Sequence, residues 1–318
     1  MPVAVKRKLL ILLCALLTGV LAVLLAGTLY VDRMLGLIGR EEPAVQQESV
    51  EPGNSPEDIS APPAEAVQVE GILNILLIGQ DRRGSAGRSL SDAMILCTLN
   101  RKTGVLTMTS FLRDSYVRIP GHGSNKLNAA YPLGGMALLD ATLEENFGVV
   151  VDGNVEVDFS QFQEIIDLLG GVEISLTDAE VRHLAHEYGF ELREGKNLLN
   201  GEQALGYARI RKLGTDFART ERQRKVLTAL IGQFRQAGIR KLHQVAQQLL
   251  GLVTTDMSNG ELLRLAAELA PLLKNLEVRS QHIPAEGTYS FGDAGRITSC
   301  IFIDFEANRA LLRQTLEG

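Results

Sequence analysis

The sequence has 318 residues, of which 45% are hydrophobic, and it contains no tryptophan. This length suits one large domain or two smaller ones, and the formal net charge of −6 disfavours a nucleic-acid partner held by bulk electrostatics. Cys14, Cys97 and Cys300 form no CxxC or Cys/His metal pattern, and we expect Cys97 and Cys300 to be separate buried thiols rather than a disulfide.

The N-terminus has the pattern of a membrane anchor. Basic residues at 6–8 precede an uncharged, mainly apolar run at 9–30, which is long enough to cross a bilayer. Because basic residues stay on the cytoplasmic side, we expect a cytoplasmic tail at 1–8, a transmembrane helix at 9–32, and the remainder outside the cell membrane. A cleaved signal peptide is the alternative, but its apolar region is usually only about 7–15 residues long.

A change in composition marks the start of the folded part. The segment between residues 33 and 70 is rich in Glu, Pro, Ser and Ala and poor in large apolar side chains, which is typical of a disordered tether. We therefore expect a linker at 33–70, a main domain at 71–238, and a C-terminal extension at 239–318 that packs on the main domain.

The first half of the main domain alternates between apolar runs and helical patterns. Short apolar runs predict buried strands, and KTG at 102–104 supplies a hairpin turn between two of them. Ser160 is the predicted N-cap of one helix, and glycines end both helices. The expected strands are 72–79, 92–100, 105–111, 117–120, 154–159 and 172–177, and the expected helices are 136–148 and 160–171.

The second half continues in the same way. The segment 201–214 begins as a helix. The segment 218–238 has the apolar stripe of a long amphipathic helix. Ser258, with Glu261 three residues later, predicts a capped helix start. Strands are expected at 278–284 and 297–305, and a last helix at 306–316. The mixture favours an α/β domain, a layered αβα arrangement with a mixed central β-sheet flanked by helices.

Two carboxylates flank the loop between the first two predicted strands. Asp81 comes just after the first strand, and Asp92 opens the second. At one sheet edge, two carboxylates with open water positions suit Mg²⁺, or Mn²⁺, because both ions prefer oxygen ligands. The alternative is a surface turn in which each acid pairs with Arg82, Arg83 or Arg88.

Arginines gather after another strand and around the helix 218–238. They are Arg113, Arg209, Arg211, Arg219, Arg222 and Arg224. On a helix, Arg219 and Gln223 share one face because they lie four residues apart, whereas Arg222 either joins them or faces solvent. Arginine suits bidentate recognition of phosphate better than lysine, so the cluster favours a pyrophosphate ligand. The alternative is a solvated helix face balanced by Asp216 and Glu221.

Common catalytic motifs are absent from the sequence. It contains no GxxxxGK[ST] loop, no GxGxxG after a strand, no HExxH and no GxSxG. The five histidines are scattered, and a Ser–His–Asp site has no motif support.

Seven segments, in this order, resemble motifs of the LytR–CpsA–Psr (LCP) proteins of Gram-positive cell envelopes. They are NILLIGQDRR, SDAMILCTLN, SFLRDSYVRIPG, KLNAAYPLGG, VDFSQFQEIIDLLGGVEI, LNGEQALGYARIR and DFARTERQRKVL. The resemblance implies an enzyme that transfers a polyprenyl-pyrophosphate-linked glycopolymer onto a peptidoglycan hydroxyl and releases polyprenyl phosphate. It also implies a central sheet flanked by helices and a hydrophobic tunnel for the lipid.

The resemblance also implies roles for individual residues. The metal-associated acids are Asp81 and Asp92. The pyrophosphate clamp comprises Arg83, Arg113, Arg209, Arg211, Arg219 and Gln223. Supporting positions are Lys126, Asn128 and Asp216. Arg113 is expected to be catalytic, and Asp92 and Asp114 are the candidates for a general base. On this interpretation the carboxylates serve the metal and the arginines serve the substrate.

Two positions depart from the family pattern. Gln80 stands where the family commonly has Thr, and Leu90 stands where many members have Arg, so that Arg88 has no assigned role. Other functions also remain open. A non-catalytic, membrane-anchored regulator or scaffold that binds polyprenyl pyrophosphate would use the same arginines. A DNA-binding transcriptional attenuator is disfavoured by the predicted topology.

Overall fold

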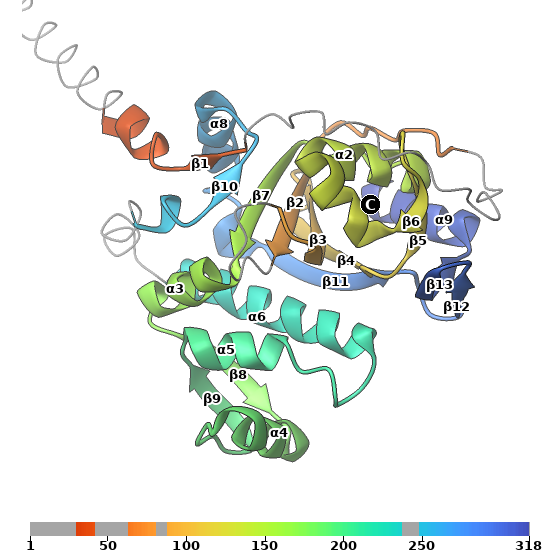
Figure 1. The fold of residues 1–318 in the computed structure, drawn as a ribbon. Helices are drawn as coiled ribbons and strands as arrows, with labels where there is room; N and C mark the ends of the chain where they lie inside the picture. Colours follow the sequence, from red (N-terminus) through yellow and green to blue (C-terminus); the bar gives the residue numbers. More distant parts are fainter. Residues whose placement is uncertain (1–29, 42–62, 81–87, 237–247, 318) are drawn as a thin grey trace, which may run out of the picture.

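A computed structural model describes residues 30–41, 63–80, 88–236 and 248–317. Its centre is a mixed sheet with the strand order β1-β10-β7-β2-β3-β4-β11 (Figure 1). The strands are β1 (Gly39–Arg40), β10 (Thr254–Thr255), β7 (Gly153–Asp158), β2 (Ile72–Gln80), β3 (Ser91–Asn100), β4 (Val105–Phe111) and β11 (Glu277–Ile283). β3 runs antiparallel to β2 and β4, whereas β7 is parallel to β2 and β11 is parallel to β4. The expected mixed sheet is confirmed.

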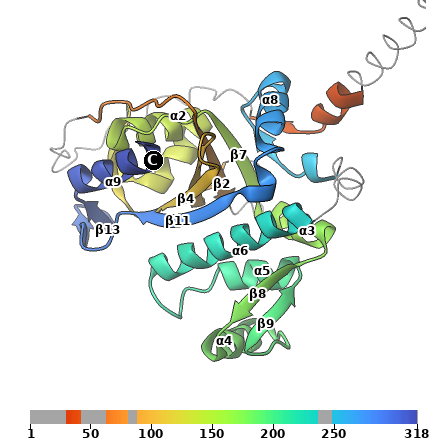
Figure 2. The same cartoon turned by 180° about the vertical axis from the view of Figure 1, so that it is seen from behind.

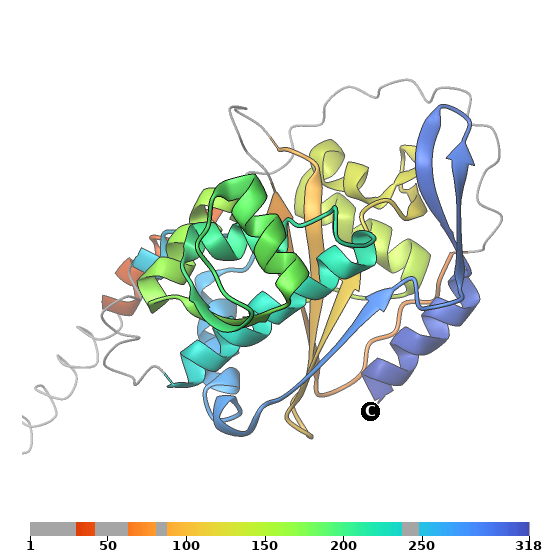
Figure 3. The same ribbon diagram turned by 90° about the horizontal axis from the view of Figure 1, so that it is seen from below.

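Helices cover both faces of this sheet (Figures 1 and 2). α2 (Ala130–Phe147) and α9 (Phe305–Glu317) pack on one face. The other face carries α3 (Phe159–Leu169), α5 (Gly201–Ala208) and α6 (Asp216–Gln236), which lie in front of the sheet when the molecule is seen from below (Figure 3). The remaining elements are β5 (Tyr116–Ile119), β6 (Gly123–Lys126), β8 (Val172–Leu176), α4 (Asp178–Tyr188), β9 (Gly195–Leu199), α8 (Asn259–Leu269), β12 (Tyr289–Ala294) and β13 (Ile297–Ile303), with short 3-10 turns at Leu127–Ala129 and Leu273–Asn275.

The two faces of β2 have different neighbours. Leu76 and Ile78 are buried in the core that α2 and α9 share with the sheet. Leu77 and Gly79, on the opposite face, are only partly buried and line a cavity under α5 and α6. The two faces of the apolar run ILNILLIG therefore have different roles: one packs in the core, and the other lines the cavity.

Local capping explains where several helices begin. Ser258 caps α8 and exchanges hydrogen bonds with Glu261, as predicted. The prediction for α3 was wrong by two residues, because Asp158 rather than Ser160 is its N-cap. The Asp158 carboxylate accepts from the Gln161 N–H at 2.9 Å, and the Gln161 side chain accepts from the Asp158 N–H. This reciprocal pair is a capping box that satisfies two backbone donors at once.

Other boundaries differ from the sequence pattern. α2 begins at Ala130 and breaks at Gly134 and Gly135, where the backbone leaves helical geometry; its part after the break starts at Met136, as expected. α5 ends at Ala208, so that the residues after it form a turn and not the helix expected through 214. The sequence analysis did not predict α4, β6, β9 or β12.

Segments on both sides of the expected main domain contribute strands to the central sheet. β10, β11 and α9 lie in the segment expected to be a C-terminal extension, and β1 lies within the expected linker and pairs in parallel with β10. The predicted transmembrane helix at 9–32 falls outside the described residues except at 30–32. In the part of the chain that the structure describes, no helix is both long enough and apolar enough to span a bilayer.

The two cysteines of the folded part are free, as expected. Cys97 lies on β3 and Cys300 is buried on β13. Burial raises the pKa of the Cys97 thiol to about 12, so this thiol stays protonated and unreactive at neutral pH.

Asp140 of α2 predicts a pH dependence of stability. Burial raises its pKa to about 7, although the Asn154 side chain donates to its carboxylate at 2.7 Å. The folded state therefore holds a proton that the unfolded state releases near pH 4, and this contribution to stability is lost as the pH rises towards 7. We expect Asp140→Asn to be more stable than the wild type at pH 8 by at most about 4 kcal/mol.

Chemical unfolding of both proteins at several pH values between 4 and 8 measures this effect. The free-energy difference between variant and wild type should grow in favour of the variant as the pH rises. Parallel pH profiles for the two proteins would contradict the assignment.

Candidate active site

A cavity of about 150 Å³ lies between the sheet and the helices α3, α5 and α6. Most of its wall is apolar. The apolar lining comprises Leu77, Ile78, Gly79, Ala93, Ile95, Val155, Val157, Phe159, Phe162, Leu205, Ala208 and Leu227. Polar and charged side chains also reach it: Asp92, Asp158, Arg209, Arg211, Arg219 and Gln223. The cavity therefore combines an apolar body with charged groups, which suits a ligand that has a long apolar part and an anionic head.

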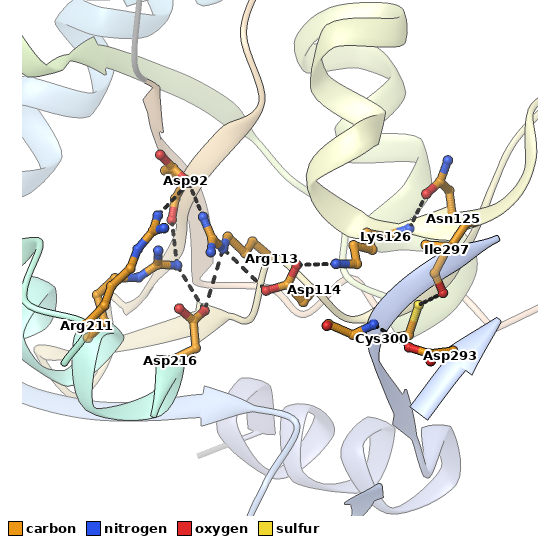
Figure 4. Close-up of polar contacts among 12 residues, drawn as sticks. Asp92, Arg113, Asp114, Asn125, Lys126, Arg211, Asp216, Asp293, Ile297 and Cys300 are labelled. Atoms are coloured by element: carbon orange, nitrogen blue, oxygen red, sulfur yellow. Dashed lines mark hydrogen bonds and ion pairs between the residues drawn. The ribbon is translucent and has the colours of Figure 1, made fainter. Parts of the chain in front are cut away.

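Arg113 is the centre of the charged network beside this cavity (Figure 4). It lies two residues after the end of β4, and its Nη1 contacts the Asp92 Oδ1 at 2.5 Å. Its Nε lies 3.4 Å from an oxygen of Asp114 and 3.9 Å from one of Asp216. The start of β3, the segment after β4 and the start of α6 thus meet at one guanidinium. This guanidinium holds three carboxylates together.

The surrounding carboxylates decide the protonation of Arg113. Burial acts to lower its pKa, but the negative charges of Asp216, Asp92 and Asp114 outweigh burial and raise it. Arg113 is therefore fully charged at any physiological pH. The direct contact between Asp92 and Arg113 was not expected from the sequence, where carboxylates and arginines had been given separate partners.

Arg219 and Gln223 share one face of α6, as predicted, and both line the cavity. Arg219 is 2% exposed, and its Nη2 contacts Asp216 at 2.9 Å. Burial lowers the pKa of Arg219; Asp216 opposes this effect, and the positive charges of Arg113 and Arg211 add to it. The Arg219 Nε and the Gln223 Oε1 are buried and find no hydrogen-bond partner among the described residues. A ligand oxygen in the cavity would provide the partner that the Arg219 donor needs.

Arg209 and Arg211 follow α5. Arg209 lines the cavity and lies over the Phe159 ring at 4.7 Å from its centroid, a cation–π geometry. Arg211 is more exposed, at 59%, and its Nη2 lies 3.8 Å from Asp92. An exposed arginine at the edge of the cavity remains able to turn towards an incoming anion.

The three supporting positions, Lys126, Asn128 and Asp216, contact the charged network around Arg113. Lys126 contacts Asp114 at 2.9 Å (Figure 4). Asn128 is buried, and its N–H donates to the carbonyl of Arg113 at 3.1 Å. Asp216 is the first residue of α6 and joins Arg219 to Arg113. Each acid of the network therefore contacts at least one cation besides Arg113.

Arg222 and Arg224 turn away from this cluster. Arg222 neither joins Arg219 nor faces solvent: it contacts Glu180 at 2.8 Å and donates to the carbonyls of Ile210 and Leu213. Arg224 is also buried and donates to the Ser110 hydroxyl at 2.7 Å. These two arginines join α6 to the neighbouring elements and are not part of the candidate site.

Two of the predicted site residues, Asp81 and Arg83, lie outside the described residues. The strands on either side of this segment are described. Gln80, the last residue of β2, pairs with Ser91, the first residue of β3. The residues that immediately precede Asp81 and Asp92 in the sequence are thus direct neighbours in the sheet.

Comparison with known proteins gives the chain a family. The model of the LytR_cpsA_psr family matches residues 39–299. The chain belongs to the LytR–CpsA–Psr family. The resemblance found in the seven sequence segments is thereby confirmed, and the matched region extends beyond them through β11 and into β13.

The proteins similar to this chain include one named as a regulator and one named as a transferase. The chain is 30% identical to the regulatory protein MsrR of Staphylococcus aureus over 257 residues, covering 79% of this chain and 76% of MsrR. It is 38% identical over 166 residues to TagT of Bacillus subtilis, named a polyisoprenyl-teichoic acid–peptidoglycan teichoic acid transferase, covering 50% of this chain and 52% of TagT. A structure of TagT with bound octaprenyl pyrophosphate superposes with a TM-score of 0.60 at 26% identity, covering 88% of this chain and 99% of that structure.

The cavity lining of this LCP protein was the main part of the site that the sequence analysis did not name. Part of the signal was present in the strands, because β2 is mainly apolar on both faces and β7 alternates valines with polar residues. Leu77, Gly79, Val155 and Val157 point to the cavity from these strands. Without the sheet order, the apolar face that opens to a cavity looks the same as the face that packs in the core.

Arg222 tests whether the arginines of α6 have separate roles. Replacing Arg222 with Ala leaves Glu180, which is 7% exposed, without its charged partner, and breaking a buried ion pair is strongly destabilising. We expect Arg222→Ala to lower the free energy of unfolding by roughly 3 kcal/mol. Urea unfolding measures this loss.

Lys225 on the same helix provides the control. It contacts Glu221 at 2.8 Å, but both side chains are more than half exposed. Exposed pairs contribute at most about 1 kcal/mol, so Lys225→Ala should change stability little. Equal losses in the two variants would contradict a structural role for Arg222.

Proposed function

We propose that this LCP protein is a Mg²⁺-dependent phosphotransferase. It moves a polyprenyl-pyrophosphate-linked glycopolymer, of the teichoic-acid, capsular or another secondary wall-polymer type, onto a sugar hydroxyl of peptidoglycan. The observation that carries the proposal is the cavity, whose apolar wall ends at a cluster of arginines beside Asp92. The transferase name of TagT and its structure with octaprenyl pyrophosphate support the same substrate class.

The transfer exchanges one bond at phosphorus for another. The oxygen of the acceptor hydroxyl forms a bond to the phosphorus that carries the glycan. The bond from that phosphorus to the bridging oxygen breaks, and polyprenyl phosphate leaves with the bond electrons. The hydroxyl proton passes to a base. Positioning and charge stabilisation supply most of the catalysis in reactions of this kind.

The arginines suit the charge that develops on the leaving phosphate. Arg219 lies in the cavity wall, where its buried Nε has no hydrogen-bond partner in the described part of the chain, and Arg211 and Arg209 also line the cavity. Arg113 does not line the cavity but holds Asp92 and Asp216 in place from behind. On this arrangement Arg219, Arg211 and Arg209 bind the pyrophosphate together with Arg83, and Arg113 orients the cluster and strengthens its positive field.

Asp92 and Asp114 were the two candidates for the base. Asp92 lines the cavity, whereas Asp114 is not among its lining residues and contacts Lys126. Asp92 is therefore better placed to receive the acceptor proton or to hold a metal. Asp114 is better placed to orient Arg113, which it contacts at 3.4 Å.

The residues present fit a metal that is shared with the substrate. Among the described residues no group of three or more His, Cys, Asp or Glu side chains forms a metal site. Mg²⁺ commonly binds through one or two carboxylates together with substrate phosphates and water, so Asp92 and Asp81 suffice as protein ligands. When bound there, Mg²⁺, or Mn²⁺, would neutralise charge on the pyrophosphate oxygens.

A membrane location follows from the substrate. A polyprenyl carrier is confined to the bilayer, and the apolar run at 9–30 would hold the domain beside it as a single-pass anchor. The basic residues at 6–8 support an N-terminus in the cytoplasm and a domain outside, where peptidoglycan would be the acceptor.

Arg113→Ala tests the charged network. Asp92, Asp114 and Asp216 keep contacts with Arg211, Lys126 and Arg219 after the change, so the fold should lose little stability. The positions of Asp92 and Asp216 depend on Arg113, and we expect transfer to fall at least about 100-fold. Purified full-length protein, lipid-linked polymer, Mg²⁺ and peptidoglycan provide the assay.

Arg235→Ala is the matched control on stability and charge. Arg235 lies at the far end of α6, where it donates to the carbonyls of Lys274 and Leu276. It should retain wild-type transfer. Wild-type transfer by Arg113→Ala would refute the proposed role of the network.

Ala93→Leu tests the cavity as the lipid site. Ala93 lines the cavity beside Gly79, and a larger apolar side chain there fills space that the lipid chain needs. We expect the affinity for octaprenyl pyrophosphate, measured by calorimetry, to fall at least about tenfold, because each buried methylene contributes about 0.8 kcal/mol. The melting temperature should not fall. Unchanged affinity would place the lipid elsewhere.

A non-catalytic regulator remains the second candidate, and the name of MsrR as a regulatory protein favours it. The same cavity would bind the polyprenyl pyrophosphate. Tight binding of octaprenyl pyrophosphate without transfer by the wild type, over a range of Mg²⁺ concentrations, would support this function over the transferase.

A further inference from the structure

Arg88, to which the sequence gave no role, contacts a residue that enters the fold from the N-terminal side. Its Nη2 lies 3.1 Å from the Glu41 Oε1, and the two side chains are 24% and 14% exposed. Arg88 lies four residues before Asp92. We propose that Glu41 and Arg88 form a positioning pair, which fixes the start of β3 and thereby the place of Asp92 in the active site. The inference deepens the proposed transferase function and rests on it.

Glu41 is held firmly enough to act as an anchor. It follows β1, where Gly39 and Arg40 pair with Thr254 and Thr255 of β10. The Arg40 guanidinium also donates to the Met257 carbonyl and to the Asn259 side chain. The Glu41 N–H donates to the Thr255 carbonyl at 3.3 Å. Within the segment expected to be a linker, residues 39–40 are thus a strand of the central sheet, and the residue that contacts Arg88 follows this strand directly.

The break in α2 creates the second support for Glu41. Because Gly134 and Gly135 leave helical geometry, the Met136 N–H begins a new helical segment and has no helical acceptor. It donates to the Glu41 carboxylate, at 3.0 Å to Oε1 and 3.3 Å to Oε2. A carboxylate at the start of a helix is stabilised further by the helix dipole.

Gly135 leaves the space that the pair occupies. A Cβ at this position would lie 2.3 Å from the Glu41 Oε1 and 2.9 Å from the Arg88 Cζ and Nη2. Its φ of 69° is also in the region that L residues rarely adopt. The Gly-Gly of KLNAAYPLGG therefore both bends α2 and admits the ion pair.

The segment from Arg88 to Asp92 is short, and a second contact, at Ser89, also holds it in place. The Ser89 N–H donates to the Gln80 Oε1 at 3.0 Å. Gln80 is fully buried, and its Nε2 donates to the buried carboxylate of Glu156, which also accepts from the Tyr131 hydroxyl. Arg88 fixes the chain to β1 and α2, and Ser89 fixes it to β2 and β7. Gln80 thereby has a structural use at the position where the family commonly has Thr.

The distances from the Asp92 carboxylate to its arginine partners depend on this framework. Its Oδ1 contacts Arg113 at 2.5 Å and lies 3.8 Å from Arg211. A displacement of about 1 Å at a reacting centre can lower a rate roughly 100-fold. Arg88 acts through Asp92 and need not contact the substrate itself.

Arg88→Gln, Glu41→Gln and the double variant test the pair in the full-length protein. Glutamine at position 41 keeps an oxygen for the Met136 N–H but removes the charge. We expect each single variant to lower kcat about tenfold or more, with KM for the lipid-linked polymer changed less than about twofold. The double variant should match the single variants, because either change removes the same ion pair.

Arg101 and Glu268 supply the matched control. They also lie 3.1 Å apart, with 32% and 26% exposure, and neither belongs to the site. Arg101→Gln and Glu268→Gln should leave kcat unchanged. A loss of kcat in these variants equal to that of the Glu41 and Arg88 variants would overturn the proposal.

Two further outcomes separate the alternatives. If Arg88 instead binds the pyrophosphate, Arg88→Gln will raise KM strongly while Glu41→Gln stays like the wild type, and the positioning role is overturned. If the wild type shows no transfer, the proposed function fails, and amide hydrogen exchange over residues 89–92 decides the positioning role alone. Faster exchange there in the Glu41 and Arg88 variants, but not in the controls, supports it; unchanged exchange refutes it.

Discussion

The site depends on the balance of charge next to the apolar cavity. Arg113 joins Asp92, Asp114 and Asp216, which come from three different parts of the chain. Each charge would be costly to bury alone, so the group is stable only as a connected network. Because further cations, such as Arg219 and Arg211, surround the same acids, the network can hold its shape and still present positive charge to an anionic ligand.

The helix α6 shows how one amphipathic segment serves structure and function together. Arg219 and Gln223 face the cavity, whereas Arg222 turns to Glu180 and Arg224 to Ser110. The buried structural arginines fix the rotation of the helix about its own axis. That rotation decides which residues face the cavity, so the precision of the candidate phosphate-binding side chains depends on contacts made on the other faces of the helix.

The segment that leads from the predicted anchor is part of the same framework. β1 extends the central sheet. Glu41 contacts both α2 and Arg88, which lies four residues before Asp92. For a protein that acts on a lipid-linked substrate, this arrangement would couple the attachment to the membrane with the geometry of the site. It would serve a transferase and a lipid-binding regulator equally well.

The sequence by itself determined the strands 72–80, 91–100 and 105–111 to within about two residues, because their apolar runs are continuous and bounded by turn residues. It also placed Arg113 after a strand and put Arg219 and Gln223 on one face of a helix, because strand ends and helical spacing depend only on local order. The N-cap of α3 is a local pair of Asp158 and Gln161 that the sequence analysis did not choose. The partner of Arg222 and the cavity lining, by contrast, were decided by the tertiary structure. Each depends on which distant segment lies opposite a side chain, as Glu41 does for Arg88, and no local pattern records that information.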